Sequence, residues 1–173
     1  MNFSQISKYH WTWLVLILVI VFIDQQSKLF VVERFNVYDR YTLTAFLDFT
    51  RLHNTGAAFS LFASDSGWQR WPLILISAGV GVTLVGWLIR NAFRATAALN
   101  LSLALIAGGA IGNLVDRLSQ GYVVDFILFH IGQWYYPAFN IADACITIGL
   151  ILFLIENFRS EKKVENSAKD RSL

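Results

Sequence analysis

Several polar side chains in this sequence stand in surroundings that are otherwise apolar, and their types could do chemistry. The acids are Asp116, Asp125 and Asp143, accompanied by the carboxamides of Asn54, Asn113 and Asn140 and by the guanidinium of Arg117. An ionisable side chain within a membrane span costs at least a few kcal/mol, so it usually faces a partner inside the protein and marks a functional site. We predict that these side chains converge at one level of the molecule.

Two carboxyl groups that share one site form the simplest catalytic arrangement available to this set. Because their like charges prevent both from ionising, one carboxyl keeps a proton as general acid while the other, charged, activates a water molecule. Such a pair hydrolyses a peptide bond without a metal ion. Spacing allows Asp143 to pair with either Asp125 or Asp116. Arg117 beside Asp116 favours an ion-paired carboxylate there, which leaves Asp125 as the freer partner.

Other catalytic arrangements have weaker support. The single cysteine, Cys145, excludes an internal disulfide and a CxxC site, and its place inside an apolar stretch is typical of an inert thiol. No serine stands in a recognisable nucleophile motif, and His10, His53 and His130 lack the spacing of metal ligands. We therefore expect no cofactor and no metal ion.

The composition is that of a membrane protein. Hydrophobic residues make up 55% of the 173 positions and charged residues only 15%, against about 25% in globular domains. The mean hydropathy is +0.50. A net charge of +2 is too small to drive binding to a polyanion, so we expect no nucleic-acid partner.

Four stretches are long enough to cross a bilayer, since a helix needs about 20 apolar residues to do so. They are about 11–31, 71–89, 95–115 and 138–157, within one domain of residues 1–158 that a charged tail, 159–173, follows. The predicted fold is therefore an all-α membrane protein of four transmembrane helices. No cleavage site follows the first span, so we expect it to stay as an anchor.

Two features of the spans predict how the helices pack. Asp24 and Lys28 are spaced i, i+4 inside the first span and can form an ion pair that docks this helix. On the third span Ala104, Gly108 and Gly112 recur every four residues, which allows another helix to approach closely. We expect both features to be structural.

The flanking charges predict the orientation, because basic residues gather in short cytoplasmic segments. Eight of the fourteen basic residues fall on one side: Lys8, Arg90, Arg94, Arg159, Lys162, Lys163, Lys169 and Arg171. Both termini are then cytoplasmic, and the outer segment of about 32–70 lies on the opposite side. Residues 41–52 of this segment favour one or two short strands, and 57–68 favour a short helix on the bilayer surface.

Five motifs in order closely resemble the lipoprotein signal peptidase family, also called signal peptidase II, an aspartic peptidase of the bacterial inner membrane. They are DQQSK at 24–28, HNTGAAFS at 53–60, GGAIGNLVDR at 108–117, GYVVDF at 121–126 and FNIADACI at 139–146. The resemblance covers nearly the whole chain.

The resemblance implies a catalytic dyad of Asp125 and Asp143 just below the outer, periplasmic surface of the membrane. It implies substrate-binding positions at Asn54, Gly56, Asn113, Arg117 and Asn140, and supporting positions at Asp24, Lys28 and Asp116. The substrate of the family is a diacylglyceryl-modified prolipoprotein, which is cleaved on the amino side of the modified cysteine. The resemblance also implies contact with membrane lipids and binding of the peptide-like inhibitor globomycin. We expect a monomer.

Two alternatives use the same acids. A magnesium-dependent lipid phosphotransferase or phosphatase would hold Mg²⁺ with Asp116, Asp125 and Asp143, although Arg117 alone is then placed to bind phosphate. A small transporter would use Asp24, Lys28 and Asp143, but its acids should be spread across the membrane rather than gathered at one surface.

Overall fold

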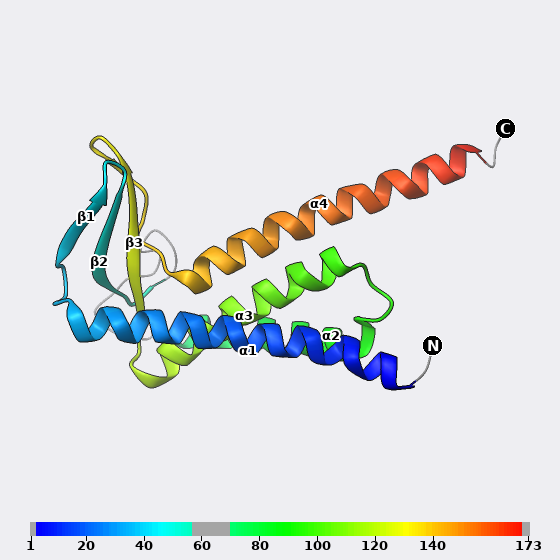
Figure 1. Ribbon diagram of the computed structural model, residues 1–173, viewed down its shortest axis with the longest axis horizontal. Helices are drawn as coiled ribbons and strands as arrows, with labels where there is room; N and C mark the ends of the chain where they lie inside the picture. The colour runs from blue at the N-terminus through cyan, green and yellow to red at the C-terminus, as the bar shows by residue number, and fades with distance from the viewer. Residues whose placement is uncertain (1–2, 57–69, 171–173) are drawn as a thin grey trace.

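The fold, obtained as a computed structural model, consists of four long helices and one small sheet (Figure 1). The structure describes residues 3–56 and 70–170, and the side chains of 9–56, 70–160 and Lys162. In chain order the elements are α1 (Phe3–Arg34), β1 (Arg40–Thr44), β2 (Leu47–Asn54), α2 (Arg70–Asn91), α3 (Ala97–Ser119), β3 (Val123–Ile131), β4 (Trp134–Tyr135) and α4 (Ile141–Asp170).

Each of the four helices contains a segment long and apolar enough to cross a membrane, which confirms the predicted count. These segments are Tyr9–Arg34, Arg70–Asn91, Ala97–Ser119 and Ile141–Ser160. The sheet lies at one end of the helices, and the N-terminal end of α1 and the C-terminal end of α4 both lie at the other end (Figure 1). Many large apolar side chains on the outer helix faces are exposed, among them Leu18, Phe22, Leu75, Val82 and Ile151.

Two span boundaries differ from the predicted ones. Helix α3 continues four residues beyond position 115, to Ser119, because Asp116 is buried inside the protein and needs no contact with water. Helix α4 begins at Ile141 rather than at 138, because Phe139 pairs with Ile127 of β3 and Asn140 caps the helix. The charged tail continues the last helix, since α4 runs to Asp170 and residues 159–170 contain neither Gly nor Pro.

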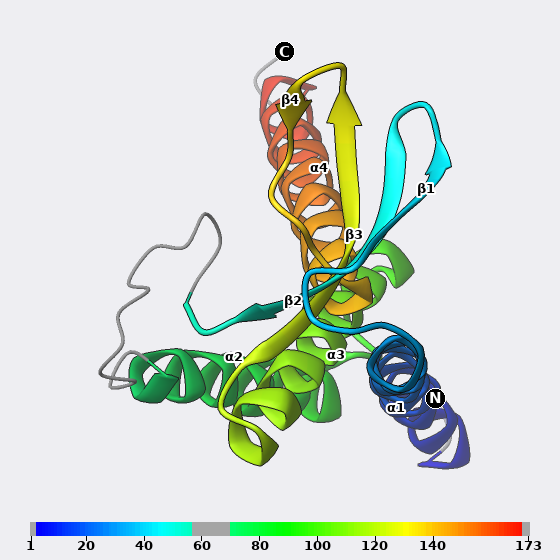
Figure 2. The same ribbon diagram turned by 90° about the vertical axis from the view of Figure 1, so that its left-hand side faces the viewer.

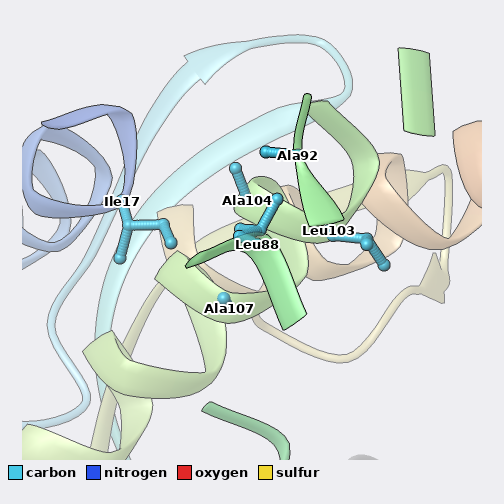
Figure 3. Close-up of a cluster of buried hydrophobic side chains, with 6 residues drawn as sticks. All are labelled: Ile17, Leu88, Ala92, Leu103, Ala104 and Ala107. Atoms are coloured by element: carbon cyan, nitrogen blue, oxygen red, sulfur yellow. The ribbon is translucent and has the colours of Figure 1, made fainter. Parts of the chain in front are cut away.

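The helices pack around α3 through small residues. The buried cluster of Ile17, Leu88, Ala92, Leu103, Ala104 and Ala107 joins α1, α2 and α3 (Figure 3). A Cβ atom added at Gly108 would lie 2.8 Å from Ile20 of α1, so this glycine permits the contact between α1 and α3. The predicted close approach on the small-residue face of α3 is confirmed.

The sheet is antiparallel and has the strand order β1-β2-β3-β4 (Figure 2). The strands predicted in the outer segment are present as β1 and β2. Strands β3 and β4 come from the segment between α3 and α4, where we predicted none, so the protein is largely but not wholly helical. The Val, Ile and Phe residues of β3 carried that signal. The short helix expected at 57–68 lies outside the described residues.

Candidate active site

The cavity that holds the candidate site lies where the sheet meets α3 and α4. It has a volume of about 1120 Å³, and Asp125 and Asp143 both line it. Of the other residues implied by the resemblance, Asn54, Gly56, Asn113 and Arg117 also line it. The structure thus brings together residues from β2, α3, β3 and α4 that lie up to 89 positions apart in the sequence.

Asp125 is held on β3 by two carboxamides. Asn54 of β2 donates from Nδ2 to Oδ2 at 2.9 Å, because Leu52 and Asn54 pair with Asp125 and Val123 across the sheet. Asn140 donates from Nδ2 to Oδ1 at 2.7 Å. Asp125 is only 3% exposed. Burial, together with the charge of Asp143, raises the pKa of Asp125 to about 7, although the hydrogen bonds from the two amides lower it.

Asp143 is fixed by the way in which α4 begins. Its backbone N–H donates to Oδ1 of Asn140 at 2.9 Å, while the N–H of Asn140 donates to Oδ2 of Asp143 at 3.4 Å. These reciprocal bonds form a capping box, which places Asp143 in the first turn of α4. The Nδ2 of Asn113 donates to Oδ1 of Asp143 at 2.8 Å.

A second polar group lies beside the cavity, and we call it the lysine cluster: Asp24, Gln25 and Lys28 of α1 with Asp116 of α3. Lys28 Nζ lies 2.7 Å from Asp24 and 3.0 Å from Asp116, so the predicted pair of Asp24 and Lys28 is confirmed. Gln25 donates to Asp116 at 2.8 Å. Asp24, Lys28 and Asp116 are 0%, 3% and 3% exposed. The expected pairing of Asp116 with Arg117 was wrong, because its charge partner is Lys28.

The backbone also uses these carboxylates. Asp24 accepts the N–H of Ala142 at 2.9 Å, and Asp116 accepts the N–H of Val124 at 3.2 Å. One contact docks α1 against the start of α4, and the other docks α3 against β3. Gly112 leaves room for this arrangement, since an added Cβ atom would lie 2.6 Å from Oδ2 of Asp24.

Asn113 joins the lysine cluster to the cavity. Its Oδ1 accepts from Lys28 Nζ at 3.0 Å and from Asn140 at 3.3 Å, while its Nδ2 donates to Asp143. The amide orientation is thereby fixed, because only the oxygen can accept from an ammonium group.

Arg117 and Gly56 also line the cavity, and a hydrogen bond joins them. Arg117 donates to the carbonyl of Asn113 at 3.3 Å and to that of Gly56 at 3.4 Å, and the N–H of Gly56 donates to Oδ1 of Asn54 at 3.0 Å. Both bonds of Arg117 go to carbonyl groups rather than to a carboxylate. Its charge is therefore available near Asp125 and Asp143.

Sequence reasoning missed two parts of this region. Gln25 contacts both Asp24 and Asp116, and a carboxamide inside an apolar span was a signal that could have revealed it. Tyr38, Tyr135 and Tyr136 line the cavity, but nothing local in the sequence distinguishes them from other interfacial aromatic residues.

The three acids required by the magnesium alternative do not meet. Asp116 belongs to the lysine cluster, whereas Asp125 and Asp143 line the cavity. Within the part of the chain that the structure describes, no group of three or more His, Cys, Asp or Glu side chains is arranged to hold a metal ion.

Comparisons with known proteins agree with this arrangement. A sequence profile described as "Signal peptidase (SPase) II" matches residues 16–159. A lipoprotein signal peptidase of Shewanella amazonensis is 42% identical over 165 residues, which is 95% of this chain and 96% of that protein. Another from Burkholderia multivorans is 42% identical over 147 residues, 85% of this chain and 87% of that protein.

Solved structures give the same result for the fold. One, described as a bacterial membrane enzyme, has a TM-score of 0.78 and 28% identity and covers 88% of this chain and 90% of its own. A second with the same description has a TM-score of 0.72 and 30% identity, covering 84% and 91%. This chain therefore belongs to the signal peptidase II family and is a multi-pass membrane peptidase.

Proposed function

We propose that this peptidase removes the signal peptide from diacylglyceryl-modified prolipoproteins and cleaves on the amino side of the modified cysteine. Asp125 and Asp143 activate the attacking water. One observation carries the proposal: two carboxyl groups from separate elements border one cavity and are held by carboxamides, and no Lys or Arg among the described residues forms an ion pair with either.

The two carboxyl groups have different environments, and these assign their roles. Asp143 is the base, because Asp125 holds the proton of the pair and Asn113 fixes Asp143 at the cavity by donating to its Oδ1. Asp125 is the acid, because burial and the neighbouring charge keep its proton in place up to about pH 7. Asp143 takes a proton from water as the oxygen attacks the peptide carbonyl, and Asp125 donates its proton to the developing oxyanion.

The polar residues around the pair position the substrate. Arg117, Asn54 and Asn113 line the cavity and supply polar groups around the reacting carbonyl, and Gly56 lets the peptide approach closely. Asn140 is fully buried and acts through Asp125, to which its amide donates. Part of the cavity wall belongs to α4 at Ile146 and Ile148, the latter 52% exposed on the outer helix face. The acyl chains of the substrate remain in the bilayer on this side, so membrane depth sets the position of the scissile bond.

The distribution of basic residues supports one orientation of the enzyme in the membrane. We place the enzyme in the bacterial inner membrane with both termini cytoplasmic and the sheet and active site at the periplasmic face. It acts as a monomer without a cofactor, and a globomycin-type cyclic peptide competes with the substrate in the cavity.

The test is cleavage of a diacylglyceryl-modified prolipoprotein by the purified chain in detergent, followed as a gel shift with excess EDTA. We expect cleavage to survive chelation and to be blocked by globomycin. The unmodified prolipoprotein is the matched control and should stay intact. If cleavage stopped in EDTA and returned with Mg²⁺, the metal-free mechanism would be refuted.

A further inference from the structure

A polar cluster crosses the sheet outside the membrane, and the proposed mechanism does not use it. It consists of Arg40 from β1, Asp48 from β2, His130 from β3 and Tyr135 from β4, and we call it the sheet cluster. Each strand contributes one member. The register places them on one face, because Thr42 is opposite Asp48, Asp48 is opposite Leu128 and His130 is opposite Tyr135.

Asp48 is the centre of the sheet cluster. It is fully buried and accepts a hydrogen bond from Arg40, while Nε2 of His130 lies 3.3 Å from its Oδ2. Burial opposes ionisation, but these partners hold the pKa of Asp48 below its ordinary value. A buried carboxylate with such partners fixes the guanidinium of Arg40 in place.

Arg40 in turn holds Tyr135. Its Nη2 donates to the hydroxyl of Tyr135 at 2.9 Å, and its guanidinium lies 4.6 Å from the centre of the Tyr135 ring. The ring of His130 also packs against Tyr135, with ring centres 5.2 Å apart. Tyr135 is therefore fixed by hydrogen bonding and by ring contacts although it is 44% exposed.

Tyr135 matters because it also lines the cavity that contains Asp125 and Asp143. It is the only member of the sheet cluster among the described lining residues. His130, the partner of Tyr135, lies five positions after Asp125 on β3. Since a strand rises about 3.3 Å per residue, Tyr135 lies roughly 10–17 Å from the carboxyl pair, its side chain reaching back toward Arg40.

We infer that Tyr135 binds the substrate chain on the carboxyl side of the scissile bond, with Arg40 as the residue that positions its ring. The inference rests on the proposed lipoprotein substrate. The signal helix and acyl chains extend into the bilayer, whereas β3 runs from beside α3 to a tip that it shares with β4, away from α1, α2 and α3 (Figure 2). An extended peptide also spans about 3.3 Å per residue, so Tyr135 meets the third to fifth residue after the cleavage site.

The experiment compares two substrates in the purified enzyme. One is a lipid-modified peptide with ten residues after the modified cysteine, and the other ends at that cysteine. For Tyr135→Ala we expect KM to rise about tenfold on the long substrate with kcat nearly unchanged, because a buried aromatic contact is lost. On the short substrate neither constant should change. Tyr41→Ala is the matched control: this β1 tyrosine is 52% exposed and does not line the cavity.

The role of Arg40 is tested by a double-mutant cycle. Arg40→Lys keeps a charge beside Asp48 but loses the planar fork that reaches Asp48 and Tyr135 together. We expect a rise of about threefold in KM on the long substrate, and no further rise when Arg40→Lys is added to Tyr135→Ala. Tyr135→Phe keeps the ring and should lie between wild type and Tyr135→Ala.

Equal losses on both substrates, or an unchanged KM on the long one, would overturn the inference. Additive effects in the cycle would remove Arg40 from its positioning role. A wild-type enzyme that cleaves neither substrate would instead refute the proposed function, so the two failures are distinguishable.

Discussion

The lysine cluster and the aspartate pair contain the same kinds of side chain but differ in what neutralises their charge. In the lysine cluster one ammonium group lies between two carboxylates, and Gln25 and two backbone N–H groups complete the hydrogen bonding. Asp125 and Asp143 have carboxamides as partners and face a cavity. The neutralised carboxylates of the lysine cluster hold helices together, whereas the amide-held pair is the one that we propose to transfer a proton.

Removing either carboxyl of the aspartate pair should have the largest effect. Asp125→Asn and Asp143→Asn keep the size of the side chain but cannot exchange the proton, so we expect turnover to fall by about 10⁴-fold. Thermal unfolding in detergent should show no loss of stability, because each change keeps the size of the side chain and leaves a single ionisable carboxyl at the site. A variant that is folded and cleaves at a near-normal rate would exclude its residue from the catalytic pair.

The lysine cluster should respond in the opposite way. Lys28→Met leaves Asp24 and Asp116 buried without their cation, which we expect to cost about 3–5 kcal/mol of unfolding free energy. Lys28→Arg, which keeps the charge, is the matched control and should lose less. Cleavage per folded molecule should fall far less than for Asp125→Asn. A stable but inactive Lys28→Met enzyme would contradict the structural role of this cluster.

The contrast also shows which parts the sequence could predict. Four spans follow from bilayer thickness, and the pair of Asp24 and Lys28 follows from one helical turn, so both were accessible to local reasoning. The partner of Asp116 was not, because Lys28 lies 88 positions away and the neighbouring Arg117 was the more obvious candidate. Strand β3 was missed although its Val, Ile and Phe residues favour a strand, because its partners in β2 lie 69 to 82 positions away and the pairing itself leaves no local pattern. The roles of Asp125 and Asp143 remain predictions.

Helix contacts beneath the lysine cluster can be tested with glycine substitutions. At Gly112 an added methyl group would lie 2.6 Å from Oδ2 of Asp24, so we expect Gly112→Ala to destabilise the protein by about 1–3 kcal/mol. Gly86 of α2 is the matched control, since nothing lies within 4 Å of its added Cβ atom. Gly86→Ala should stabilise the helix by up to about 1 kcal/mol. Equal responses at both positions would mean that the approach of α1 to α3 is loose.

The smallest expected effect is a shift in the pH dependence of cleavage. Because the pKa of Asp125 is about 7, raising the pH through 7 removes the acid of the pair, and kcat/KM should fall on the alkaline side. His53 does not account for this limb, because burial and Arg51 lower its pKa below 6.5.

Asn54 donates to the ionised form of Asp125, so Asn54→Ala should raise the pKa of Asp125 by up to about one unit and move the alkaline limb to higher pH. Asn91→Ala, which removes a carboxamide that donates to the carbonyl of Trp87 at the far end of α2, should leave the limb in place. An alkaline limb that does not move in Asn54→Ala would assign the titration to a group other than Asp125.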